Sequence, residues 1–98
     1  MERSSRITKK FAELAKAKRT AFMPFLVAGD PDYKRSLAFA KALVKNADLL
    51  ELGFPYSDPL ADGPTIQAAD ARALKSGMTV SKVFSLVRDI RKASDIPI

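Results

Sequence analysis

The sequence predicts an α/β fold built on a parallel sheet, and three observations lead to that prediction. Short strand-like runs of apolar residues alternate with longer stretches whose apolar residues recur at helical spacing. The helical stretches have the length that βαβ units require. The composition, with 47% hydrophobic and 29% charged residues among 98, is that of an ordinary globular protein. We therefore expect one domain, or part of one, over residues 1–98.

The first half of the chain contains two predicted helices and one predicted strand. A helix over about 4–18 is indicated by apolar residues at helical spacing, namely Ile7, Phe11, Leu14 and Ala15. Residues 21–27 (AFMPFLV) are typical of a strand, and Pro24 favours an edge position. A second helix over 31–46 is expected to begin at Asp30, because its oxygen can cap and Pro31 has no N–H to leave unpaired. Capping is preferred to anion binding there, since Asp30 would repel an anion.

The second half continues the alternation. A strand at 48–53 is followed by a helix over about 65–75, which Gly77 ends. Thr79 is the predicted cap of a further helix, whose apolar stripe consists of Val80, Val83, Phe84, Val87 and Ile90. The closing residues 95–98 (DIPI) are typical of the start of a third strand.

Two absent residue types narrow the possible chemistry. The chain has no cysteine, which excludes disulfides, thiolate nucleophiles and thiolate metal sites. It has no histidine, which removes the commonest general base and most zinc sites. Acid–base catalysis in this chain must therefore use Asp, Glu, Lys or Tyr.

The net charge of +6 is concentrated at one end. Residues 1–20 carry seven basic and two acidic side chains, and the remaining residues contribute only +1. We expect a solvated helix face, with a nucleic acid or another anionic partner as the lesser alternative. Because no apolar run approaches a membrane span and the N-terminus lacks the apolar core of a secretory signal, we expect a cytoplasmic protein.

The stretch 51–64 (ELGFPYSDPLADGP) is the candidate functional site. Ligands of parallel α/β folds bind beyond the carboxyl ends of the strands, where Glu51 and the loop 54–64 are expected. The apolar strand should surround Glu51 with a low dielectric and raise its pKa, as a general acid or base near neutrality requires. Asp62, held in a loop rich in proline and glycine, could place a fixed negative charge opposite developing positive charge.

Simpler interpretations of the same residues remain open. Glu51 could pair with a basic residue or cap a helix. Asp58 in SDP and Asp62 before Gly63 are common turn formers. A magnesium ion held by the three carboxylates is a further alternative.

Longer segments of the chain resemble a known family. MPFLVAGDPD at 23–32, LLELGFPYSDPLADGPTIQAADARAL at 49–74 and the closing IPI resemble the tryptophan synthase α subunit. The segments cover nearly the whole chain in the family's order and spacing, and SDPLADGP after ELG is a highly specific signature. Two departures are small, since Tyr56 and Phe54 stand where the family usually has Phe and a smaller aliphatic residue.

The resemblance implies a (β/α)8 TIM barrel, a lyase of L-tryptophan biosynthesis. It would cleave indole-3-glycerol phosphate to indole and glyceraldehyde 3-phosphate without metal or organic cofactor. The family's motif makes Glu51 the acid–base catalyst and Asp62 the residue that binds the indole N–H. Phe25 would line the indole pocket, and Asp58 and Pro59 would lie in a mobile loop facing the β subunit. Pyridoxal phosphate belongs to that partner, with which the family forms an α2β2 assembly.

The length of the chain sets a further expectation. A (β/α)8 barrel takes roughly 250 residues, whereas the sequence has 98 and stops as a third strand begins, before the family's phosphate-binding loops. We therefore expect the N-terminal portion of a barrel, from a helix before the first strand to the start of the third strand, that is inactive by itself. A non-catalytic module that binds the β subunit through loop 54–64 is the alternative hypothesis.

Overall fold

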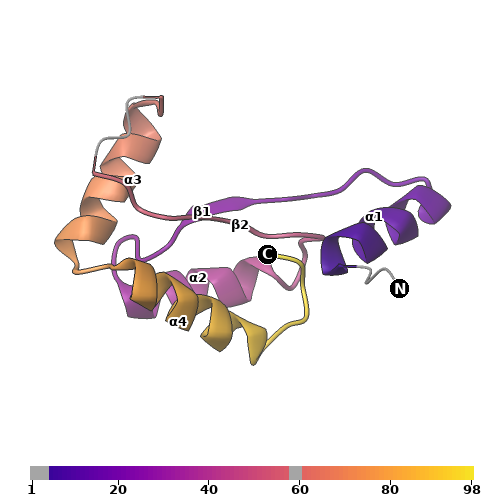
Figure 1. Ribbon diagram of the computed structural model, residues 1–98. Helices are drawn as coiled ribbons and strands as arrows, with labels where there is room; N and C mark the ends of the chain where they lie inside the picture. The colour runs from indigo at the N-terminus through magenta and orange to yellow at the C-terminus, as the bar shows by residue number, and fades with distance from the viewer. Residues whose placement is uncertain (1–4, 58–60) are drawn as a thin grey trace.

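A two-stranded parallel sheet lies at the centre of the computed structural model, which describes residues 5–57 and 61–98 (Figure 1). The elements in chain order are α1 Arg6–Ala17, β1 Phe25–Val27, α2 Tyr33–Leu43, β2 Glu51–Gly53, α3 Pro64–Lys75 and α4 Val80–Arg91. Strand β1 pairs with β2 in the register Phe25↔Glu51, Leu26↔Leu52 and Val27↔Gly53. The predicted alternation and the parallel pairing are confirmed, although both strands are shorter than expected.

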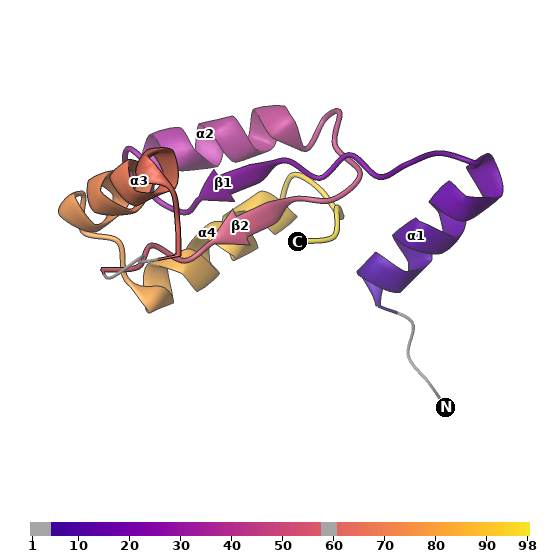
Figure 2. The same ribbon diagram turned by 90° about the horizontal axis from the view of Figure 1, so that it is seen from above.

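The helices are distributed unevenly around the sheet. Figures 1 and 2 show α2 and α4 side by side against one face, α3 at one end and α1 beyond the other end. The buried core lies between the sheet and α2, α3 and α4, and consists of Val27, Ala28, Ala40, Leu50, Ala69, Ala73, Met78, Val83, Leu86 and Ile90. The opposite face of the sheet carries no helix along most of its length in the part of the chain that the structure describes.

Helix α1 is less buried than its apolar stripe suggests. Ser5 caps it by accepting a hydrogen bond from the Thr8 N–H, and Lys18 ends it with φ 55°. Only Leu14 of the stripe is buried, and Phe11 remains 50% exposed. Most of its other side chains are exposed as well, which fits the expected solvated face.

The predicted start of the second helix is wrong by two residues. Asp32, not Asp30, caps α2, because its carboxylate accepts a hydrogen bond of 2.8 Å from the Arg35 N–H. The Asp30–Pro31 peptide bond is cis. The Asp30 carboxylate instead binds the Arg72 guanidinium of α3 at 2.7 and 3.0 Å.

The predicted end of α3 and the predicted start of α4 are confirmed, whereas the predicted apolar face of α4 is confirmed only in part. Gly77, with φ +96°, follows α3, and Thr79 caps α4 by accepting a hydrogen bond from the Lys82 N–H. On α4 the inward face is formed by Val83, Leu86 and Ile90. Phe84, expected in that stripe, is 63% exposed.

The third strand predicted at 95–98 is not part of the sheet within residues 5–57 and 61–98. One backbone contact does reach this segment, because the Leu50 N–H donates to the Pro97 carbonyl at 2.9 Å. The segment therefore lies beside the residue before β2. None of the helices in the described ranges is long and apolar enough to cross a membrane.

A tyrosine–carboxylate hydrogen bond connects α2 with α4. Because the hydroxyl loses its proton at high pH, we expect the folded chain to become less stable there. The Tyr33 hydroxyl donates to Asp89 at 2.5 Å. Burial, this hydrogen bond and the charge of Asp89 raise the pKa of Tyr33 from 10.0 to about 12. Because the folded pKa lies above the unfolded one, the stabilisation is present below pH 10 and disappears as the pH rises through about 12. We expect Tyr33→Phe to lower the melting temperature at pH 8 and to flatten its decline above pH 10.

Thermal unfolding followed by circular dichroism from pH 8 to 12 measures this effect. Tyr56→Phe is the matched control, because Tyr56 is exposed and its hydroxyl should not contribute. Equal pH profiles for Tyr33→Phe and the wild-type chain would contradict the prediction.

Candidate functional site

Glu51 is the first residue of β2, whereas it was expected near the carboxyl end of a strand at 48–53. Its N–H donates to the Pro24 carbonyl at 2.9 Å, which fixes the backbone at this position. The side chain is exposed, so the predicted apolar enclosure is absent from the described part of the chain. Glu51 is exposed because, among the described residues, β2 pairs with β1 along one edge only. No described strand lies along the other edge of β2.

Phe25 and Glu51 lie on one face of the sheet. They are register partners in a parallel pair, and side chains two residues apart on a strand point to the same side, which adds Gly53 to this face. The Phe25 ring extends over Gly53, because a Cβ at that glycine would lie 2.7 Å from the Phe25 Cζ. Two of the predicted site residues are therefore brought together by strand pairing.

An apolar groove of about 410 Å³ follows the uncovered edge of β2. Glu51 contributes to its wall, and the other lining residues include Met23, Leu49, Leu52, Phe54, Val87 and Ile98. Its volume lies within the range of ligand pockets. Because it runs along a strand edge without a partner among the described residues, it is also the surface on which a further strand would pack.

Asp62 is held by the first turns of α3. Gly63 is the N-cap residue of that helix and Pro64 occupies its first turn, which is a favourable position for proline. The Gln67 Nε2 donates to the Asp62 carbonyl at 2.6 Å. Within residues 5–57 and 61–98, no hydrogen bond or ion pair joins Asp62 to Glu51. The two predicted catalytic carboxylates are thus positioned by separate elements.

Asp70 is a residue of this site that the sequence prediction missed. It lies on α3 and is 3% exposed. Burial raises its pKa above the ordinary 3.8, and the negative charge of Asp62 raises it further. The sequence could have predicted the burial of Asp70, because Asp70 stands four residues after Ile66 and therefore lies on the apolar face of the helix.

Two predicted site residues and the predicted magnesium alternative remain to be placed. Asp58 and Pro59 lie outside the described residues. Among residues 5–57 and 61–98, no three acidic side chains converge in a way that could hold a metal ion.

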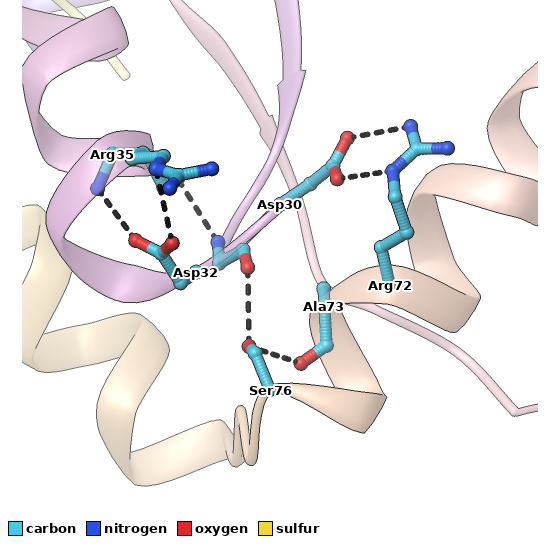
Figure 3. Close-up of polar contacts among 8 residues, drawn as sticks. Asp30, Asp32, Arg35, Arg72, Ala73 and Ser76 are labelled. Atoms are coloured by element: carbon cyan, nitrogen blue, oxygen red, sulfur yellow. Dashed lines mark hydrogen bonds and ion pairs between the residues drawn. The ribbon is translucent and has the colours of Figure 1, made fainter.

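The turn between β1 and α2 is fastened to α3 (Figure 3). Besides the two hydrogen bonds between Asp30 and Arg72, the Ser76 hydroxyl donates to the Gly29 carbonyl at 3.3 Å and to the Ala73 carbonyl at 2.7 Å. The Gly29 N–H donates to the buried Ser36 hydroxyl at 3.0 Å. These contacts fix the position of α3, and with it the residues that hold Asp62.

Comparison with curated proteins identifies related sequences along the chain. The family profile described as "Tryptophan synthase alpha chain" matches residues 11–98. The tryptophan synthase alpha chain of Phenylobacterium zucineum is 53% identical over 88 residues, which are 89% of this chain and 32% of the relative. That of Opitutus terrae is 53% identical over 95 residues, which are 96% and 36% respectively. The chain thus spans about a third of the length of these curated relatives.

Solved structures show the same similarity in three dimensions. Tryptophan synthase subunit alpha from Legionella pneumophila superposes with a TM-score of 0.89 at 34% identity, covering 97% of this chain and 37% of that one. Tryptophan synthase from M. tuberculosis in an open form superposes with a TM-score of 0.86 at 38% identity, covering 93% and 37%.

Proposed function

This chain belongs to the tryptophan synthase alpha chain family, and from that premise we propose that it serves in the cleavage of indole-3-glycerol phosphate to indole and glyceraldehyde 3-phosphate. The match through residues 11–98 carries the proposal. The placement of Glu51 beside Phe25 on the open sheet face supports it. The reaction is a retro-aldol cleavage, for which we propose no metal or organic cofactor.

Glu51 is proposed as the acid–base catalyst. In the cleavage, the carbon–carbon bond between the indole ring and the side chain breaks. The ring carbon gains a proton and the side-chain hydroxyl loses one, so a single carboxyl group can deliver the first and accept the second. Phe25 offers an apolar ring on the same face, against which the indole can pack.

Asp62 is proposed to bind the indole N–H. Positive charge grows on the ring nitrogen when the ring carbon is protonated, and a fixed carboxylate stabilises that charge without having to reorganise. The hydrogen bond from Gln67 of α3 to the Asp62 carbonyl supports this role, because it fixes the backbone that carries the carboxylate and a stabilising charge must keep its position.

Residues 1–98 are proposed to form the N-terminal portion of a (β/α)8 barrel. The parallel pair β1 and β2, the helices that cover one face and the uncovered β2 edge all fit such a portion. Further strands would enclose Glu51 and provide the phosphate site that we expect from the family's later loops. We propose a cytoplasmic protein, as its biosynthetic substrate implies.

The β subunit of tryptophan synthase is the proposed partner. Phe54 and Tyr56, at the start of the loop 54–64, are both exposed, which favours a contact surface there. Asp58 and Pro59 are proposed to belong to the same surface. Binding of the β subunit without any lyase activity would favour the alternative hypothesis of a non-catalytic module.

A chimera tests the proposed function. Residues 1–98 replace the matching segment of the Opitutus terrae protein, to which they are 53% identical over 95 residues. We expect the chimera to release indole from indole-3-glycerol phosphate, and the 98-residue chain alone to release none. An inactive chimera that is correctly folded would refute the proposed function, and turnover by the chain alone would refute its expected inactivity.

A further inference from the structure

Gly53, the last residue of β2, is a glycine that the strand itself does not require. It pairs with Val27 in the regular register of the sheet, and its carbonyl accepts a hydrogen bond of 2.9 Å from the Ala28 N–H. Its φ lies outside the left-handed region in which glycine is favoured. Glycine weakens a strand and often marks a place where another group approaches closely. The reason for this glycine should therefore lie in the space around it.

The space at Gly53 is occupied by an aromatic ring. A Cβ at this position would lie 2.7 Å from the Phe25 Cζ and 3.0 Å from the Phe25 Cε2, so one of the groups would have to move. The next nearest atom among the described residues is the Leu26 carbonyl oxygen at 3.8 Å, which is an ordinary contact distance. Of these neighbours, Phe25 alone excludes a side chain from position 53.

The same contact shows how the Phe25 ring lies on the sheet. Phe25 is the register partner of Glu51, yet the tip of its ring reaches Gly53, two residues further along β2. Side chains on a strand commonly lean along the strand direction, and each residue advances a strand by about 3.3 Å. The ring thus crosses from β1 to β2 on the carboxyl-terminal side of Glu51, and the Glu51 side chain stays exposed.

A side chain at position 53 would displace the ring. Because the clash involves the tip of the ring, rotation about the side-chain torsions of Phe25 can relieve it. Such a rotation moves the ring either back along the strands, over Glu51, or away from β2. In both cases the apolar surface on which an indole ring can pack changes its position relative to the Glu51 carboxyl. A displacement of about 1 Å in a reacting complex can cost about 100-fold in rate.

We propose that Gly53 is a positioning residue for Phe25. By having no side chain, it lets the ring lie over β2 beyond Glu51, so that the space above the Glu51 carboxyl stays open to the planar indole ring of the substrate. The consequence for substrate binding rests on the proposed function. The packing of the ring on Gly53 does not, because both residues belong to this chain.

Proton NMR of the 98-residue chain tests the packing of the ring. We expect nuclear Overhauser effects between the Phe25 ring protons and the Gly53 Hα protons, and a ring-current shift of those Hα resonances. Phe25→Leu should abolish the shift. Phe39→Leu is the matched control, because it removes a 48% exposed ring from α2, and it should leave the shift unchanged. Absence of these effects, or a shift that survives Phe25→Leu, would overturn the proposal.

Steady-state kinetics of the chimera described above test the effect on the reaction. We expect Gly53→Ala to lower kcat/KM for indole-3-glycerol phosphate by about tenfold to 100-fold. In a Phe25→Leu background the same substitution should cost less than about threefold, because leucine lacks the ring tip that meets the added Cβ. In a Phe39→Leu background it should cost as much as in the unsubstituted chimera. The quantity compared is the ratio of kcat/KM values within each background.

A defect at position 53 that does not act through Phe25 would lower kcat/KM equally in all three backgrounds. That result, or full activity of Gly53→Ala, would overturn the positioning role. If Gly53→Ala does not fold, the double variant with Phe25→Leu should still fold, since the clash is removed, and its failure to fold would equally contradict the proposal. If the unsubstituted chimera is inactive, the proposed function fails, while the NMR experiment still tests the packing of Phe25 on Gly53.

Discussion

Glu51→Gln in the chimera is expected to lower kcat for indole release by about 100-fold to 10,000-fold, the range that a general acid–base catalyst contributes. Glutamine keeps the size and polarity of the side chain and cannot exchange a proton with the ring carbon or the hydroxyl. Because Glu51 is exposed in this chain, the substitution should leave the melting temperature nearly unchanged. The measurement is steady-state release of indole, with thermal unfolding of the same samples.

Glu13→Gln is the control for that substitution, since it removes the same charge from the exposed surface of α1. It should retain full activity. A Glu51→Gln chimera that keeps most of its kcat would exclude Glu51 as the acid–base catalyst, even if the chimera remains an active lyase.

Gly29→Ala is expected to destabilise the 98-residue chain by about 2–4 kcal/mol, a large part of the stability of a small domain. Gly29 has φ +89°, which is unfavourable for a residue with a side chain. An added Cβ would also lie 1.8 Å from the Met78 Cγ, and Met78 belongs to the buried core. Strain and overpacking therefore act together, and urea unfolding measures their sum.

Gly63→Ala provides a matched comparison at another glycine. Its φ is −75°, and a Cβ there would meet nothing within 4 Å. We expect a loss of about 1 kcal/mol or less, because Ala is a poorer N-cap than Gly but adds neither backbone strain nor a steric contact at this position. Equal destabilisation by the two substitutions would show that the contact with Met78 is unimportant.

The sequence predicted the elements well where the signal is local. Gly77 and Thr79 end one helix and begin the next through contacts within a few residues, and both are where the sequence places them. The cap of α2 was harder to predict because Asp30 and Asp32 are both suitable. The choice between them depends on Arg72, which is 42 residues from Asp30 in the sequence.

The candidate site was predicted in part for a similar reason. The register of β1 and β2 brings Phe25 and Glu51 together, and the family resemblance named both residues. Asp70 was missed because its burial depends on how α3 packs against the rest of the chain, and no local motif marks it. Enclosure of Glu51 was expected from the apolar strand alone, but enclosure depends on neighbours on both sides of that strand.

The attachment of α3 to the turn between β1 and α2 has a consequence for variation among related proteins. Through Arg72 and Ser76, α3 is positioned independently of the loop that connects it to β2. The cost of closing such a loop rises by only about 0.6 kcal/mol for each doubling of its length. Changes in loop length between Gly53 and Asp62 should therefore cost little folding free energy, so what constrains the SDPLADGP signature is the placement of its functional residues rather than the stability of the frame that holds Asp62.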